Sequence, residues 1–235
     1  MKKLVVILVV VLMVASAQAV VYDLTYTGAV ETVNGAIYMQ WTDTEPMGSG
    51  RINSFVGIMG QDTQHGYNTT GALEFDTKTG AKALLLSEIP IVTFGVTDYR
   101  EFWLDINQNS QHNILSLDKL QIHMASVGDL TGYLTNPAFD TPIYDLDAGG
   151  DNYVKLDYEL NPGSGKGDML LFVPNSAFIG AGDYIYLYSM FGATINGADG
   201  FEEWAVGNGA IIPEPATLCL LGLGALSLLR RKRRA

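Results

Sequence analysis

Cysteine and basic residues are scarce in this chain of 235 residues. The single cysteine, Cys219, lies in an apolar run near the C-terminus, so the rest of the chain can form no internal disulfide and offers no cysteine nucleophile. Seven of the 14 Lys and Arg residues lie at the two ends, which leaves residues 20–212 with seven basic and 24 acidic side chains, a formal charge of −17. Because nucleic-acid affinity comes mainly from Lys and Arg that displace counterions, this composition argues against a nucleic-acid partner.

Motifs of common enzymes are also missing. The three histidines, His65, His112 and His123, show no paired spacing suited to zinc. Residues 163–167 lack the first glycine of a phosphate-binding loop, and no Gly-x-Ser-x-Gly elbow occurs. A dispersed catalytic triad stays open, since geometry and not sequence order defines one. We expect a non-enzymatic protein.

No apolar run reaches the ~20 residues that a membrane-spanning helix needs. Residues 1–19 combine two lysines, an apolar run from Leu4 to Ala15 and the small-x-small pattern of Ala17 and Ala19. This order predicts a signal peptide that signal peptidase removes after Ala19. The alternative is an N-terminal membrane anchor.

The C-terminal end, residues 211–235, has three parts in a fixed order. Pro213, Glu214 and Pro215 interrupt any helix and offer extended backbone to a processing enzyme. The apolar stretch 216–229 follows, and its 14 residues would span only about 21 Å as a helix. Five cations end it: Arg230, Arg231, Lys232, Arg233 and Arg234. Such side chains are held on the cytoplasmic side, so the stretch would halt export as a short transmembrane helix with the body outside.

This order of features resembles the PEP-CTERM sorting domain of Gram-negative bacteria, a tail also described as an ice-binding protein C-terminal domain. The resemblance implies transient insertion into the inner membrane, recognition by an exosortase, and cleavage near Pro-Glu-Pro. It also implies transfer of the body to the cell surface or the exopolysaccharide matrix. An ordinary tail anchor with a short span is the alternative.

Residues 20–210 show repeated period-2 alternation and little helical periodicity. Gly, Asn, Asp and Pro clusters separate the alternating segments, as turns require. The predicted strands are 20–27, 36–41, 54–59, 72–76, 83–86, 91–97, 101–106, 117–124, 153–160, 169–173 and 184–190. So many short strands predict one all-β domain, an antiparallel β-sandwich or jelly roll. Segments 102–107, 115–122, 165–169 and 199–204 resemble stretches of other secreted PEP-CTERM proteins.

The richest candidate for a metal site follows one predicted strand. Asp105, Asn107, Asn109 and Asn113 match positions 1, 3, 5 and 9 of an EF-hand loop, which supplies oxygen ligands to Ca²⁺. Ser116 stands where the bidentate Glu would be, and Asp118 could replace that ligand in a different loop geometry. The alternative is a polar hairpin whose Asp and Asn side chains bond to their own backbone.

A second candidate site is aromatic. Tyr184, Tyr186 and Tyr188 share one face of a predicted strand, with Ile185 and Leu187 on the other. We expect one of these faces to see solvent, where the tyrosine rings could stack on a sugar. Ordinary packing of strand tyrosines is the alternative.

Acidic residues gather in two further regions. Two carboxylates across a cleft could serve a glycosidase, but solvated loops are the favoured interpretation. The residues are Asp140, Asp145, Asp147 and Asp151 in one region and Asp199, Glu202 and Glu203 in the other.

The leading functional hypothesis is a non-enzymatic protein of the cell surface or the exopolysaccharide matrix. A carbohydrate-binding module that uses the tyrosine face is the first alternative, and a secreted glycan hydrolase is the second. The expected processing partners are signal peptidase and exosortase.

Overall fold

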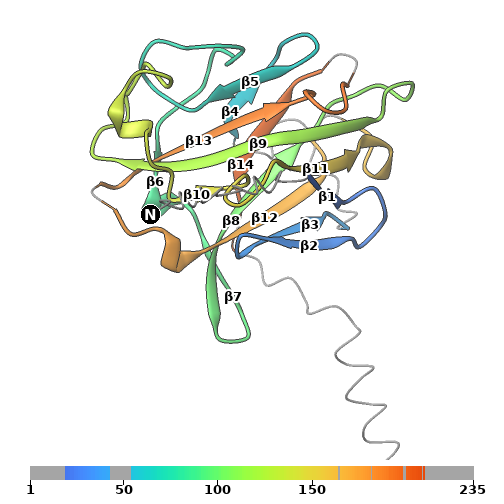
Figure 1. The fold of residues 1–235 in the computed structure, drawn as a ribbon, viewed down its shortest axis with the longest axis horizontal. Helices are drawn as coiled ribbons and strands as arrows, with labels where there is room; N and C mark the ends of the chain where they lie inside the picture. Colours follow the sequence, from blue (N-terminus) through green and yellow to red (C-terminus); the bar gives the residue numbers. More distant parts are fainter. Residues whose placement is uncertain are drawn as a thin grey trace, which may run out of the picture.

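The structure is a computed structural model that describes residues 19–42, 54–163, 165–180, 182–197, 200–207 and 209. These residues form two β-sheets and four single turns of 3-10 helix, with no α-helix among them (Figure 1). Within these described ranges no helix is both long and apolar enough to span a bilayer. The all-β prediction is confirmed. The predicted signal peptide up to Gln18 and the predicted transmembrane helix lie outside the described residues.

Sheet A contains seven strands. They are β1 (Val20–Asp23), β5 (Gln64–Tyr67), β6 (Leu84–Leu85), β9 (Ile114–Ala125), β10 (Tyr144–Asp145), β11 (Asn152–Asp157) and β13 (Tyr184–Phe191). The order is β1-β11-β9-β13-β5, with β10 beside β9 and β6 beside β13.

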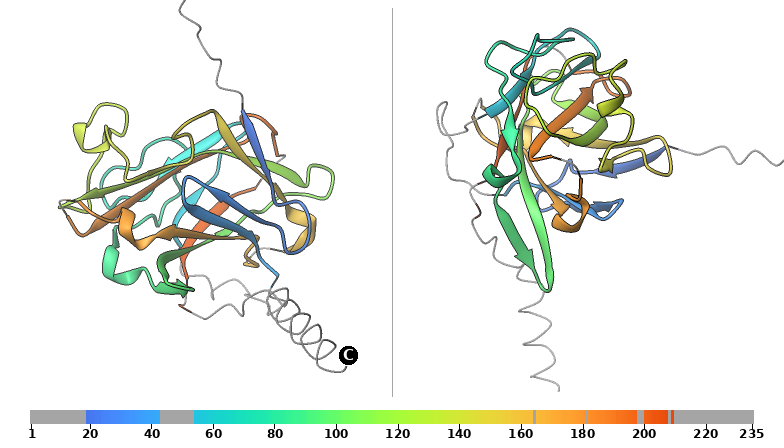
Figure 2. Two further views of the ribbon diagram at one scale, coloured as in Figure 1. Left: turned by 60° about the horizontal axis from the view of Figure 1, so that its bottom comes forward. Right: turned by 90° about the vertical axis from the view of Figure 1, so that its left-hand side faces the viewer.

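Sheet B also contains seven strands. They are β2 (Val30–Val33), β3 (Ala36–Gln40), β4 (Ser54–Ile58), β7 (Ile91–Phe94), β8 (Thr97–Asp105), β12 (Met169–Pro174) and β14 (Glu202–Val206). The order is β2-β3-β12-β8-β14-β4. β7 pairs with the first half of β8, and this hairpin projects from the body (Figure 2).

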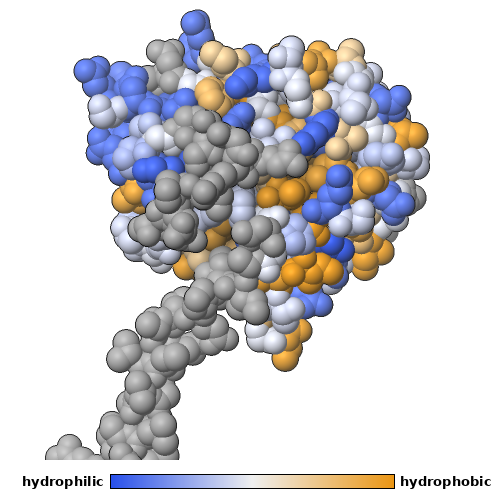
Figure 3. Space-filling model, turned by 180° about the vertical axis from the view of Figure 1, so that it is seen from behind, coloured by the Kyte–Doolittle hydropathy of each residue, from blue (hydrophilic) through white to orange (hydrophobic). Residues whose placement is uncertain are grey.

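The two sheets pack face to face around the main core. Along β12, Met169, Leu171 and Val173 enter the core between the sheets, while Leu170 and Phe172 join a second apolar cluster. This alternation is what the two-residue period of a strand dictates. The surface seen from behind carries apolar residues interspersed with hydrophilic ones (Figure 3). The arrangement is sandwich-like.

Hydrogen bonds cross the core between the sheets at two positions. Trp204 of β14 donates its indole N–H to the hydroxyl of Ser189 on β13, at 3.0 Å. The hydroxyls of Tyr38 on β3 and Tyr144 on β10 lie 2.8 Å apart, and the Tyr144 hydroxyl also donates to the carbonyl of Val33 at 3.2 Å. These bonds satisfy buried polar groups and restrict how the sheets can slide.

One strand pair corrects the antiparallel prediction. β1 pairs with β11 in parallel, with Val20 opposite Asn152, whereas the other paired strands of the described residues are antiparallel. The two strands are far apart in the sequence, so no tight turn forces them to run in opposite directions.

Several strand predictions are confirmed within a few residues, and others are wrong. Residues 72–76 form turns instead of a strand, while β2, β5, β10 and β14 were not predicted. The predicted strand at 153–160 ends at Asp157, where the chain enters a 3-10 turn.

Removing the Tyr144 hydroxyl should lower the unfolding free energy more than removing the Tyr38 hydroxyl. In Tyr144→Phe the Tyr38 hydroxyl loses its hydrogen-bond partner inside the core, which should cost about 1–3 kcal/mol of unfolding free energy. In the matched control Tyr38→Phe the Tyr144 hydroxyl keeps its bond to Val33, so the cost should be about 1 kcal/mol or less. Urea unfolding of the purified full chain measures both, and an equal or reversed order would contradict the assignment.

Candidate functional site: a buried carboxylate cluster

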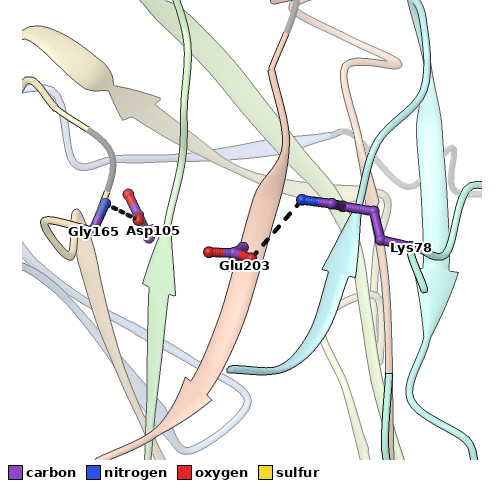
Figure 4. A network of polar contacts seen from close by, with 4 residues as sticks. All are labelled: Lys78, Asp105, Gly165 and Glu203. Carbon is purple, nitrogen blue, oxygen red and sulfur yellow. Dashed lines mark hydrogen bonds and ion pairs between the residues drawn. The ribbon is translucent and has the colours of Figure 1, made fainter. Parts of the chain in front are cut away.

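Four carboxylates lie near the end of β8 and the starts of β12 and β14. By strand alternation Asp105 and Glu203 face away from sheet A, whereas Glu202 lies on the core side with Trp204. Asp105 is the last residue of β8 and lies opposite Glu203 of β14. Asp168 directly precedes β12, and its backbone N–H donates to the carbonyl of Leu104 at 2.8 Å. Glu202 opens β14. Figure 4 shows Asp105 and Glu203 on adjacent strands, between Gly165 on one side and Lys78 on the other.

Asp105, Asp168 and Glu202 each accept a hydrogen bond through one of their two carboxylate oxygens. The N–H of Gly165 donates to Asp105 Oδ2 at 2.7 Å, and the N–H of Ile106 donates to Asp168 Oδ2 at 2.8 Å. The side-chain amide of Gln108 donates to Glu202 Oε1 at 2.7 Å. The other oxygens, Asp105 Oδ1, Asp168 Oδ1 and Glu202 Oε2, are buried and have no hydrogen-bond partner.

Burial shifts these three groups strongly toward the protonated form. The exposed fractions of Asp105, Asp168 and Glu202 are 2%, 4% and 0%. Desolvation raises the pKa of Asp105 to about 7 and the pKa of Glu202 to about 8, against the effect of their hydrogen bonds. Burial also raises the pKa of Asp168 well above its ordinary value, and the charges of Asp105, Asp157 and Glu202 add to that effect.

The nearest cation does not neutralise these buried groups. Lys78 Nζ lies 4.0 Å from Glu203 Oε1, and it sits 3.5 Å from the centre of the Phe201 ring. The Lys78 and Glu203 side chains are 32% and 25% exposed, so water screens the pair. The Lys78 stem passes over Gly57, where an added Cβ would lie 3.1 Å from Lys78 Cδ. Among the described residues no ion pair joins a cation to Asp105, Asp168 or Glu202, and the charge of Lys78 lowers the pKa of Glu202 less than burial raises it.

The structure places the proposed Ca²⁺ ligands in separate networks. Asp118 lies on β9 of sheet A, where it accepts hydrogen bonds from Ser116 Oγ and from the N–H groups of Ala193 and Thr194. Asn109 Oδ1 accepts from the N–H groups of Gln111 and His112, as the polar-hairpin alternative requires. Asn107 is half-buried in the same loop. Within the described part of the chain, no three His, Cys, Asp or Glu side chains are arranged to hold a metal ion.

The tyrosine face of β13 is covered. Tyr186 and Tyr188 are only 1% and 6% exposed, while Ile185 and Leu187 lie in the main core. The Tyr133 ring stacks on Tyr188 with 4.2 Å between centroids and an interplanar angle of 11°. The expectation that one face of this strand sees solvent is therefore wrong.

The loop of residues 127–130 covers the tyrosine face of sheet A and so forms a third layer on the sandwich. The Tyr186 hydroxyl donates to the carbonyl of Val127 at 2.7 Å and accepts from the N–H of Leu130 at 3.0 Å. Gly128 lies so close to Tyr184 that an added Cβ would be 2.8 Å from its ring. The half-buried Tyr184 thus lies beneath the loop.

The acidic regions separate into two kinds. Asp145 accepts from Gln121 and from the N–H of Asp147, and Asp147 accepts from the N–H of Asn152, which is ordinary turn chemistry. Asp140 and Asp151 are exposed, whereas Asp199 is not among the described residues. The prediction of a solvated loop is wrong for Glu202, which is fully buried in a strand.

Sequence reasoning missed Asp168 and the buried position of Glu202. Both side chains belong to strand ends that adjoin Asp105 only after sheet B has formed. The one available signal was the position of each acid directly before or at the start of an apolar run, which does not specify a partner.

A family model of the PEP-CTERM protein-sorting motif matches residues 212–234. The match contains Pro213, Glu214, Pro215 and the five cations of the tail, and it confirms the resemblance stated above. The fold and the tail together define an exported, exosortase-targeted protein with a β-sheet body. The tail residues and Ala17 lie outside the described structure, and Ala19 is the first described residue. Searches of curated proteins and of solved structures found no match.

Raising the pH should destabilise the body when divalent cations are absent. The folded cluster holds protons that the unfolded chain releases near pH 4, so this contribution is complete below pH 4 and is lost through about pH 7 and 8. Between pH 6.5 and 8.5 the unfolding free energy should fall by on the order of 3 kcal/mol. In this window folded His123 stays neutral, since burial lowers its pKa to about 4, whereas the unfolded imidazole with its pKa of 6.5 loses its remaining proton and offsets the fall by only about 0.4 kcal/mol.

Urea unfolding in EDTA at several pH values measures this fall. The neighbouring charges that act on the cluster are Glu203, Asp157 and the opposing Lys78. Asp168→Asn should flatten the profile, whereas Asp98→Asn, at an exposed position, should not. A stability that stays constant or rises over this range would contradict the buried cluster.

Removing the Tyr186 hydroxyl should loosen the covering loop. In Tyr186→Phe the Leu130 amide loses its acceptor, so its hydrogen exchange should speed up by roughly tenfold or more. Tyr188→Phe is the matched control, because that hydroxyl contacts His65 Nδ1 at 2.9 Å and not the loop. Equal Leu130 exchange in the wild type and in Tyr186→Phe would refute this anchoring role.

Proposed function

We propose that this protein is exported, trimmed at both ends and left as a non-enzymatic component of the cell surface or the exopolysaccharide matrix. Signal peptidase would cut after Ala19, and exosortase would cut near Pro-Glu-Pro after a transient stay in the inner membrane. The observation that carries the proposal is the PEP-CTERM match at residues 212–234.

The borders of the folded body suit both cuts. β1 begins at Val20, directly after the expected signal-peptide cut, and the Val20 N–H donates to the carbonyl of Asp151 at 3.2 Å. At the other end β14 closes at Val206, and the N–H of Gly209 donates to Glu101 Oε2 at 3.1 Å. Both cuts would therefore leave every described strand intact.

The polar chemistry of the body supports a structural role. Asp105, Asp168 and Glu202 are buried, so a substrate could reach them only after the strands had opened. His65 contacts Tyr188 in the aromatic layer, and His123 is 1% exposed. These side chains serve packing and hydrogen bonding in the fold.

The charge of the body suggests the kind of matrix it would meet. Residues 20–212 carry a formal charge of −17, which would repel anionic polymers and attract cations. Neutral exopolysaccharide is accordingly the favoured environment. The large core between the sheets lets the body persist outside the cell without a disulfide.

Changing the sorting signal should trap the protein. In a host that contains an exosortase, the wild type should release a body that lacks its tail into the surface or matrix fraction. The triple variant Pro213→Ala, Glu214→Ala and Pro215→Ala should remain at full length in the inner membrane. Fractionation followed by mass spectrometry of the terminal peptides distinguishes the two products.

Two controls make this result specific. Glu159→Ala with Pro162→Ala changes the same residue types at exposed positions of the body and should be processed normally. Deleting the exosortase should reproduce the trapped state with the wild-type chain. Released wild-type protein that still ends at Ala235 would overturn the proposal.

A further inference from the structure

The end of the folded body is held at a fixed point on sheet B. The buried Glu101 carboxylate accepts the N–H of Gly209 at 3.1 Å, and the Glu101 carbonyl accepts the N–H of Gly207 at 3.2 Å. A Cβ added to Gly207 would overlap Glu101 Oε2, and one added to Gly209 would lie 3.2 Å from Pro90 Cβ. Since Pro90 directly precedes β7, these contacts fix the chain at the base of the β7–β8 hairpin.

The chain also reaches this point while running toward the hairpin. β14 is antiparallel to β8, with Glu203 opposite Asp105 and Val206 opposite Phe102. It therefore runs toward the first residues of β8, which pair with β7 in the hairpin that projects from the body (Figure 2). The last strand of the body and the projecting hairpin thus point toward the same end of sheet B.

The tip of this hairpin is apolar and uncharged. Gly95 and Val96 connect the two strands, and Gly95 has a φ of 62°, which glycine adopts without a steric penalty. Val96 is 101% exposed and Ile91 is 47% exposed. Residues 89–97 contain no charged side chain. Single exposed apolar residues are ordinary on protein surfaces, so the meaning of this tip depends on where it is placed.

A short connection joins this end of the body to the apolar stretch 216–229. The six residues 210–215 lie between Gly209 and Ala216. Fully extended, the seven steps from Gly209 to Ala216 span at most about 23–25 Å, of which the headgroup layer of a bilayer takes up about 5–7 Å. With the stretch inserted, the lipid surface therefore lies within about 20 Å of Gly209. The hairpin reaches about 14 Å from Ile91 to Gly95, so its tip comes within a few Å of the lipid even at full extension.

We propose that the hairpin tip, Gly95 and Val96, contacts the lipid surface of the inner membrane while the precursor is anchored by its tail. This inference rests on the proposed function, because only an inserted tail brings the body so close to the membrane. The uncharged tip fits zwitterionic headgroups, whereas the charge of −17 on residues 20–212 opposes an anionic surface. Because the tether raises the effective concentration of the tip at the surface, one exposed valine suffices for contact. Tail and tip together give the body one orientation on the membrane.

A fluorescent probe at the tip tests this contact. Cys219→Ala removes the single cysteine of the chain, so Val96→Cys then offers one thiol for an environment-sensitive dye. The labelled full chain is reconstituted into phosphatidylcholine vesicles whose headgroups carry a quencher. Because the tether keeps the tip at the surface, quenching at position 96 should exceed that of a control position by at least about twofold.

Leu134→Cys in the same background is the matched control. Leu134 is an apolar residue that is 79% exposed, and it follows Tyr133, whose ring packs on the outer face of sheet A. The control position is therefore as accessible to the dye as the tip but belongs to the other layer of the sandwich. Both positions are exposed, so neither substitution removes a core contact.

Lengthening the connection tests the role of the tether. A flexible Gly-Ser insert after Ala210, about twice as long as the natural connection, lets the body move away from the lipid. Quenching at position 96 should then fall to the level of Leu134→Cys, while the chain stays bound to the vesicles. Quenching that the insert does not change would overturn the role assigned to the short connection.

Flotation of the vesicles separates a failure of this inference from a failure of the proposed function. A chain that floats with the vesicles but is quenched equally at positions 96 and 134 would overturn the lipid contact and leave the sorting route intact. A chain that does not float would overturn the anchored stage and the lipid contact with it. A spectral shift at position 96 that appears without quenching and grows with protein density would show contact between copies and would also overturn the lipid contact.

Discussion

The apolar side chains that β8, β12 and β14 turn toward sheet A hold these three strands together, and much else in the body depends on that packing. Leu104, Leu171 and Trp204 lie in one core from three different strands. Their register also decides which residues meet where the strands end. The same burial that stabilises the sandwich therefore removes Asp105, Asp168 and Glu202 from water.

The packing of these strands contributes both favourable and unfavourable terms to the free energy of folding. Packing the strands buries apolar surface, while the carboxylates at their ends lose hydration without a counter-ion of their own. The protein offsets that loss by holding protons on these carboxylates, which leave as the pH rises through about 7 and 8. The stability of the body therefore depends on pH at the point where these strands are joined.

The two ends of the chain act independently of that core. The folded body begins at Val20 and its last described contact involves Gly209, so the segments that direct traffic lie beyond the strands. Removing such segments does not break a β-ladder, which is why processing and folding can be separate events. The tail carries the sorting signal, and the body is the part of the chain that is sorted.

Local patterns in the sequence determined the tail, the all-β class and many strand positions. Each of these depends on residues that are neighbours along the chain: the order of Pro-Glu-Pro, apolar stretch and cations, or the alternation along one strand. The covering of Tyr186 by a loop, the parallel pairing of β1 and the burial of Glu202 were decided only by tertiary structure. They arise from contacts between segments that are distant in the sequence, and no period along one segment encodes which other segment will cover it.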